Sequence, residues 1–222
     1  MKYLLLSDVH ANMRALEAVL TDAAARGWDA ASDPVLFLGD AVGYGHEPNE
    51  VLDRLRALKP GVALRGNHEA VLLRAYADSA LRVAPNYEVT KAQTEKLSDA
   101  NRTFVEQTAM SHLDAAWGAV HGALRTPWEY LISVPVARAN EPRMARPLYF
   151  VGHTHVPAVF AKNAAGRWYS LVCRGELAFS LEPGGAAFVN PGSVGGPRDG
   201  LGASYGLYDD ASGRVSLYRL PV

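Results

Sequence analysis

Polar side chains of the types that bind metal ions follow several apolar runs along the chain. They are two carboxylates, four imidazoles and one amide, namely Asp8, His10, Asp40, Asn67, His121, His153 and His155. With His68, which directly follows Asn67, five of the seven histidines belong to this pattern. Burial of so many polar groups without partners would cost about a few kcal/mol for each group. A shared site that satisfies them together explains the pattern better than scattered core or surface histidines.

The spacing within two of these stretches is informative. Asp8 and His10 are two residues apart, and so are His153 and His155. In an extended chain such residues point to the same side, with Cα atoms roughly 6.5–7 Å apart. We therefore expect each pair to face one pocket, as ligands of neighbouring ions would.

The number of donors favours two ions over one. A transition-metal ion among nitrogen and oxygen donors takes about four to six ligands, and an active site keeps a position open. If Asp40 bridges, each of two ions receives four protein ligands. Two ions about 3.5–4 Å apart suit phosphoryl chemistry, because both can hold phosphate oxygens. A donor set without thiolate favours Mn²⁺, Fe²⁺, Ni²⁺, Co²⁺ or Zn²⁺ over Mg²⁺ or Ca²⁺, and we expect manganese to support activity.

The first third of the chain alternates between strand and helix patterns. Apolar runs at 2–6, 34–40 and 62–69 predict strands, and periodic segments at 12–27 and 47–61 predict helices between them. This order implies right-handed crossovers and a largely parallel sheet. The polar stretches then lie at the carboxyl ends of strands of one sheet, which is the edge where ligands bind in open α/β sheets.

The middle of the chain is more polar, and residues 88–108 predict two short helices with Ser98 as an N-cap. We expect residues of about 78–112 to form a helical cap or flank. The arginine-bearing segment 137–147 predicts a surface loop, and 127–132 predicts a helical turn or short helix. The other apolar runs predict strands at 115–122, 147–153, 158–163, 167–173, 186–193, 203–209 and 214–220. Without a repeat or a linker, we expect a single domain over 1–222.

Composition excludes several classes of protein. The 22 basic and 23 acidic residues nearly balance, so an extended nucleic-acid surface or a membrane-surface role has no electrostatic support. The single cysteine, Cys173, cannot close an internal disulfide, which favours a reducing cytoplasm. The apolar run near Met1 is too short for a signal peptide, and no stretch reaches the length of a membrane helix. We therefore expect a cytoplasmic protein.

The short motifs, in their order, resemble those of the calcineurin-like metallophosphoesterase superfamily. They are "DVH", "GD", "GNHE", "HG" and "GHTH". The longer stretches "GDAVGYGHEPNEVLDRL" and "NPGSVGGPRDG" are similar to a small bacterial branch of phosphodiesterases and diadenosine-tetraphosphatase-like phosphatases. The resemblance covers essentially the whole chain. It implies an α/β fold, a four-layer α/β/β/α sandwich of two mixed sheets flanked by helices, with a site for two metal ions at the edge of the sheets.

The resemblance also implies roles for individual residues. It assigns Asp8, His10, Asp40 and His155 to one ion, and Asp40, Asn67, His121 and His153 to the other. His68 matches the position whose imidazole faces the substrate. There it would stabilise the phosphoryl group or protonate the leaving oxygen.

We therefore expect a dinuclear metal-dependent phosphoesterase that hydrolyses phosphodiesters, with nucleotides as candidate substrates, by attack of a metal-bridging hydroxide. Catalytic roles fall to Asp40, Asn67 and His68. The alternatives are a phosphomonoesterase, a dinucleoside polyphosphate hydrolase, a metal sensor and, least favoured, a non-catalytic scaffold on the same fold. A homo-oligomer stays open. Candidate substrate contacts are Tyr44, His46, Arg125 and Arg198, since arginine can bind phosphate with two hydrogen bonds.

Overall fold

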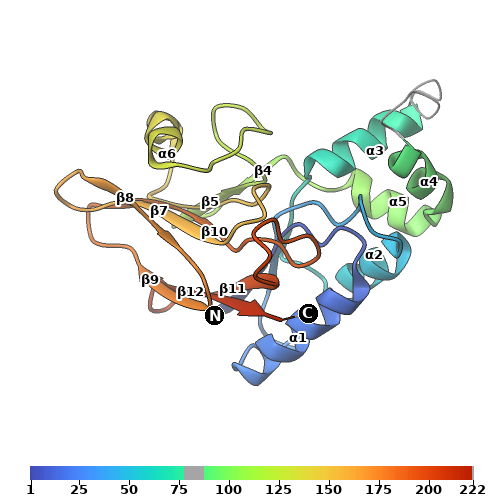
Figure 1. Cartoon of the computed structure of the whole chain (residues 1–222), viewed down its shortest axis with the longest axis horizontal. Coiled ribbons are helices and arrows are strands. Elements are labelled where there is room, and N and C mark those ends of the chain that lie inside the picture. Colours follow the sequence, from blue (N-terminus) through green and yellow to red (C-terminus); the bar gives the residue numbers. More distant parts are fainter. Residues whose placement is uncertain (78–87, 222) are drawn as a thin grey trace.

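Residues 1–77 and 88–221 are described by the computed structural model, and their strands form two mixed sheets of six strands each (Figure 1). The order in the first sheet is β3 (Val62–Ala63), β2 (Val35–Phe37), β1 (Lys2–Leu6), β11 (Ala203–Asp209), β12 (Arg214–Leu220) and β9 (Glu176–Ser180). The first three are parallel, as the alternation of strands and helices predicts, and the last three are antiparallel.

The second sheet has the same number of strands and is also mixed. Its order is β4 (Ser111–Leu113), β5 (Trp117–Val120), β6 (Leu148–Phe150), β10 (Ala186–Asn190), β7 (Ala158–Lys162) and β8 (Trp168–Val172). Strands β5, β6, β10 and β8 run in one direction, and β4 and β7 run antiparallel to them.

Alternation of side chains along each strand builds the layers. Leu5 of β1 packs into the core between the sheets, whereas its neighbours Leu4 and Leu6 face the helices. Phe150 of β6 likewise enters the core between the sheets, while Tyr149 belongs to the cluster on the outer face of the second sheet. Three apolar clusters therefore separate four layers, which confirms the expected α/β/β/α sandwich.

The outer layers are unequal. Helices α1 (Met13–Ala25) and α2 (Pro48–Ala57) cover the first sheet, and α6 (Val134–Asn140) covers the second (Figure 1). Helices α3 (Asn67–Ala77), α4 (Glu88–Lys96) and α5 (Asp99–Glu106) gather at one end of the molecule (Figure 1). Side chains cap two helices, because Asn12 accepts the N–H of Ala15 and Ser98 accepts the N–H of Asn101.

Several predictions from the sequence were wrong in detail. The strands that precede the polar stretches do not share one sheet, since β1, β2 and β3 belong to the first and β5 and β6 to the second. The segment 137–147 is not a loop, because its first residues complete α6 and residues Glu141–Arg143 form a 3₁₀ helix. Its arginines suggested exposure, but Ala137 is buried against the second sheet. Of the helical turn or short helix predicted at 127–132, the structure has a turn at its start and no helix.

Other differences concern the ends of elements. The third strand is short, and Asn67 already begins α3, so this candidate ligand lies at a helix start. Strands β4 and β9 were not predicted at all, because β4 has three residues and β9 alternates only weakly. Of the expected cap at 78–112, residues 88–106 form α4 and α5, and residues 78–87 lie outside the described residues. In the described part of the chain, no helix is long and apolar enough to cross a bilayer.

The core between the sheets is expected to dominate stability. Phe150 is fully buried and its ring contacts Trp117 of the same sheet and Tyr208 of the other. Phe150→Ala should therefore lower the free energy of unfolding by about 3–5 kcal/mol, measured by urea denaturation. The exposed Val172→Ala provides the control and should change it by less than about 1 kcal/mol. Equal effects of the two substitutions would contradict this packing.

Candidate metal centre

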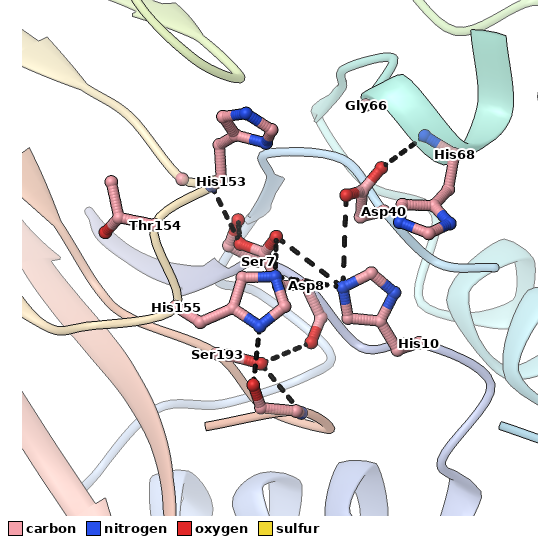
Figure 2. A network of polar contacts seen from close by, with 12 residues as sticks. Ser7, Asp8, His10, Asp40, Gly66, His68, His153, Thr154, His155 and Ser193 are labelled. Carbon is pink, nitrogen blue, oxygen red and sulfur yellow. Dashed lines mark hydrogen bonds and ion pairs between the residues drawn. The ribbon is translucent and has the colours of Figure 1, made fainter. Parts of the chain in front are cut away.

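The polar stretches meet where the carboxyl ends of strands from both sheets come together (Figure 2). Asp8 and His10 follow β1, and Asp40 follows β2. Asn67 and His68 begin α3, which follows β3. In the second sheet, His121 follows β5, and His153 and His155 follow β6. The structure thus brings together the histidines, Asp8 and Asp40 as the sequence predicts, but through two sheets instead of one.

Asp8, His10 and His155 form the first group of donors. Their ligand atoms lie within 4.8 Å of one another. Nε2 of His155 lies 3.1 Å from Nε2 of His10 and 3.1 Å from Oδ1 of Asp8. Figure 2 shows the two imidazole rings turned toward each other beside the carboxylate.

Asp40, His121 and His153 form the second group, again with ligand atoms within 4.8 Å of one another. Nε2 of His121 lies 3.3 Å from Oδ2 of Asp40. The same oxygen lies 3.9 Å from Nε2 of His10, which belongs to the first group. Asp40 therefore stands between the two groups. His68 lies at the edge of the centre, since one of its ring nitrogens is also within 4.8 Å of donor atoms of His10 and Asp40.

Backbone carbonyls fix which nitrogen of each ring faces the centre. In four histidines one ring nitrogen donates to a carbonyl, which leaves the lone pair of the other nitrogen free for a metal ion. The pairs are His10 Nδ1 with Val42 (2.9 Å), His121 Nδ1 with Leu38 (2.8 Å), His155 Nδ1 with Gly196 (2.5 Å) and His153 Nε2 with Trp128 (3.2 Å).

Burial and charge set the protonation of these groups. Burial lowers the pKa of His10 and of His153 to about 4, so both rings are neutral at pH 7 and keep their lone pairs. Burial also disfavours the charged form of His121, but the adjacent Asp40 outweighs it and raises the pKa of His121 to about 10. Asp40 thus stabilises a positive charge at His121. A bound metal cation supplies such a charge in place of the proton.

Three donor atoms are buried and have no hydrogen-bond partner among the described residues. They are Oδ1 of Asp8, Oδ1 of Asn67 and Nε2 of His121. Buried polar atoms normally find a partner, and metal coordination is one way to provide it. Carboxylate, amide and imidazole are donors that divalent transition metals accept. The residues therefore fit a metal centre.

The backbone at the candidate ligands differs from the extended chain that the spacing suggested. Asp8, His10, Asp40, His153 and His155 have φ values of 54°, 49°, 60°, 68° and 63°. This left-handed region is costly for residues other than glycine and concentrates at functional sites. The tight turns send His155 to the first group and His153 to the second. The expectation of an extended chain was wrong, although both rings do reach the same centre.

Glu69 organises the centre, although the sequence indicated no role for it beyond its place at the end of the motif "GNHE". Its buried carboxylate accepts the backbone N–H groups of Asp40 (2.8 Å), Ala41 (2.8 Å) and Gly66 (2.7 Å). Burial and the charge of Asp40 raise the pKa of Glu69 to about 7. Gly66 has no room for a side chain, since a Cβ there would lie 1.9 Å from Oδ1 of Asp40. Glu69 thus joins the start of α3 to the loop after β2.

Gln93 is a second residue that the sequence did not indicate, because it lies in a polar helix without a motif. Its buried side chain accepts the N–H of Gly43 (2.7 Å) and donates to the carbonyl of Gly45 (3.1 Å). The turn between these glycines carries Tyr44 beside the centre. A Cβ on Gly43 would lie 2.1 Å from Nδ1 of His68, so the turn also contacts that imidazole.

The candidate substrate contacts differ in their surroundings. Tyr44 is exposed, and its ring centroid lies 4.7 Å from those of His10 and His68. His46 is exposed and lines with Tyr44 a cavity of about 480 Å³ that also reaches His10. Arg125 forms an ion pair with Glu129, which already compensates its charge. The guanidinium of Arg198 contacts the hydroxyl of Tyr130 at 3.4 Å. Tyr130 was not among the residues predicted from the sequence.

Comparison with known proteins identifies the family. The calcineurin-like phosphoesterase superfamily domain matches residues 1–213. The chain belongs to this superfamily. An uncharacterized protein of Methanocaldococcus jannaschii is 31% identical over 228 residues, which span 97% of this chain and 85% of the relative.

Two solved structures share the fold. The crystal structure of a metallophosphoesterase from Sphaerobacter thermophilus is 33% identical, with a TM-score of 0.84, and the match covers 100% of this chain and 89% of that one. An archaeal phosphodiesterase, 15% identical with a TM-score of 0.51 over 99% of this chain and 100% of its own, shares the fold alone. The chain is thus a metal-dependent phosphoester hydrolase of the calcineurin-like superfamily, as its motifs predict.

The hydrogen bonds of Gln93 lead to a prediction about stability. Gln93→Leu keeps the size of the side chain but leaves a buried N–H and a carbonyl of the 43–45 turn without partners. The free energy of unfolding should fall by about 1–3 kcal/mol, measured by urea denaturation. The same substitution at the exposed Gln107 is the matched control and should have little effect. Equal stability of both variants would contradict the anchoring role of Gln93.

Proposed function

We propose that the chain is a dinuclear metal-dependent phosphodiesterase, with nucleotides among its candidate substrates. The observation that carries the proposal is the position of Oδ2 of Asp40, 3.3 Å from Nε2 of His121 and 3.9 Å from Nε2 of His10. One carboxylate oxygen therefore faces both groups of donors, as a ligand shared by two ions must.

In this proposal each ion takes four protein ligands. One takes Asp8, His10, Asp40 and His155, and the other takes Asp40, Asn67, His121 and His153. The buried atoms of Asp8, Asn67 and His121 that lack a hydrogen bond support this division. Four ligands per ion leave positions for substrate. We propose Mn²⁺ for activity, while the nitrogen and oxygen donors also suit Fe²⁺, Ni²⁺, Co²⁺ or Zn²⁺.

When bound, such a pair of ions supplies Lewis-acid stabilisation of the phosphoryl oxygens and an activated water nucleophile. The amide of Asn67 helps to orient a non-bridging oxygen of the phosphoryl group. The imidazole of His68 donates a proton to the departing oxygen as its bond to phosphorus breaks. Oδ1 of Asp40 accepts the N–H of His68 at 2.9 Å, which couples the position of that imidazole to the metal centre.

Two exposed aromatic rings support a diester over a monoester. Tyr44 is 58% exposed beside His10 and His68, and Tyr130 is 43% exposed and stacks on His153. The mouth of the centre therefore offers one aromatic surface over each donor group. A diester carries two organic groups that can use both surfaces, whereas a monoester carries one. Phosphomonoesters and dinucleoside polyphosphates are the alternative substrates.

The other roles considered receive less support. A non-catalytic scaffold does not require a complete set of metal donors together with His68. A metal store does not require an additional imidazole at the edge of the centre. Cys173 is buried and unpaired, which fits the cytoplasmic location that the sequence favours.

A comparison of substrates tests the proposed function. The chain loaded with Mn²⁺ should hydrolyse bis(p-nitrophenyl) phosphate with a higher kcat/KM than p-nitrophenyl phosphate, because only the diester fills both aromatic surfaces. Release of p-nitrophenolate reports on both reactions. Removal of metal with EDTA should abolish turnover, and added Mn²⁺ should restore it. A preference for the monoester would overturn the diesterase proposal, and turnover without metal would overturn the metal centre.

Asp40→Asn provides the variant for the same experiment. The amide keeps the size of the side chain but removes the charge shared by the two groups, so metal affinity should fall by at least about 10–100-fold and turnover should be lost. Metal titration and the diester assay measure the two effects. Asp53→Asn, at a side chain that is 62% exposed, is the matched control and should retain both properties.

The role of His68 predicts a dependence on the leaving group. His68→Gln should slow hydrolysis of diphenyl phosphate, whose phenolate needs a proton, by about 10²–10⁴-fold. It should slow hydrolysis of bis(p-nitrophenyl) phosphate much less, because p-nitrophenolate departs readily without a proton. Values of kcat for the two diesters test this, with His112→Gln as the control, because His112 lies in β4 and belongs to neither donor group. The same factor for both diesters would assign His68 to phosphoryl binding instead of proton donation.

A further inference from the structure

Tyr130 has an unusual position for an exposed aromatic residue. Its ring stacks on His153 with centroids 4.1 Å apart and an angle of 23° between the planes. The carbonyl of Trp128, two residues earlier, accepts a hydrogen bond from the same imidazole. The segment before α6 therefore covers one side of the second donor group with an aromatic ring, yet 43% of the surface of Tyr130 stays exposed.

Arg198 holds this ring from the loop that follows β10. One of its N–H groups contacts the hydroxyl of Tyr130 at 3.4 Å, and its Cζ lies 5.6 Å from the ring centroid. The guanidinium also interacts with the hydroxyl of Tyr44. Among the described residues, no carboxylate lies within ion-pair distance of Arg198, in contrast to Arg125 and Arg219. Its charge is therefore available to attract an anionic ester to the mouth of the centre.

The two tyrosines stand in different chemical surroundings. Tyr44 contacts His68, the group that would protonate the departing oxygen, with ring centroids 4.7 Å apart. Tyr130 contacts His153 and Arg198, on the side of the second donor group. A diester bound across the centre thus meets His68 and Tyr44 at one end and Tyr130 at the other.

We propose that Tyr130, held by Arg198, forms the subsite for the organic group that stays on phosphorus when a diester is cleaved. This inference rests on the proposed function. In the reaction the oxygen of water bonds to phosphorus, the P–O bond to the departing group breaks, and a proton joins the departing oxygen. The second ester bond stays intact, and its aryl or nucleoside group lies against the exposed surface of Tyr130.

Binding of phosphonates that cannot be hydrolysed tests the subsite apart from catalysis. Calorimetry on the Mn²⁺-loaded chain compares phenylphosphonate with methylphosphonate. The phenyl compound should bind about 2–12-fold more tightly, which is the gain in affinity that one aromatic pair usually provides. In Tyr130→Leu, which keeps apolar bulk against His153, this preference should fall below about twofold, and in Tyr130→Phe it should persist.

The controls separate this subsite from its neighbours. Ile132→Ala, at a side chain that is 65% exposed two residues away, should leave the preference unchanged. Titration of Mn²⁺ should give equal metal content for all variants, so that a change in phosphonate binding reports on the ring. Loss of the preference in Tyr44→Leu but not in Tyr130→Leu would overturn the assignment, as would the absence of any preference in the unaltered chain.

Kinetics provide the second readout. Tyr130→Leu should lower kcat/KM for bis(p-nitrophenyl) phosphate about 2–12-fold and leave p-nitrophenyl phosphate within about twofold, because the monoester has no retained organic group. Equal losses for both substrates would show that Tyr130 only supports His153, and would overturn the subsite. If the unaltered chain fails to hydrolyse the diester at all, the proposed function is wrong, whatever the phosphonates show.

Discussion

Two carboxylates buried close together impose the constraint on which the rest of the centre depends. Asp8 and Asp40 are both buried, and Nε2 of His10 lies 3.8 Å from one and 3.9 Å from the other. Backbone and side-chain donors satisfy one oxygen of each carboxylate, since Asp8 accepts from Ser7 and His153 and Asp40 accepts from His68. The other oxygens face imidazole nitrogens. Buried negative charge of this kind is costly without compensation, and divalent cations provide it.

That constraint explains why the surrounding backbone is tight and strained. Left-handed residues at the ligands and glycines without room for a Cβ let loops from two sheets approach within hydrogen-bond distance. In the loop after β1, the N–H groups of Asp8 and His10 donate to the carbonyls of Gly39 and Asp40 in the loop after β2. Glu69 joins that second loop to α3. The core between the sheets supplies the stability that keeps these turns in place.

The residues around the opening of the centre differ between its two sides. His68 and Tyr44 stand beside one donor group and Tyr130 stacks on a histidine of the other, while Arg198 contacts the hydroxyls of both tyrosines. In the proposed centre the two metal ions would polarise any phosphate ester, so the asymmetry of the rim is what can distinguish the departing group from the retained one. Substrate preference therefore depends on loops outside the metal ligands, which is where proteins of one fold diverge most readily.

The motifs in the sequence indicated the superfamily by themselves, and the resemblance implied the four layers. The candidate metal ligands could be selected from the sequence because residue type and position after an apolar run are local properties. Tertiary structure alone decided that strands of two sheets share the site and that left-handed turns direct His153 and His155 to different groups. It also decided that Glu69 and Gln93 hold the loops and that Tyr130 lies on His153. These contacts join segments far apart in the chain through left-handed turns and buried hydrogen bonds, which leave no periodic pattern in the sequence.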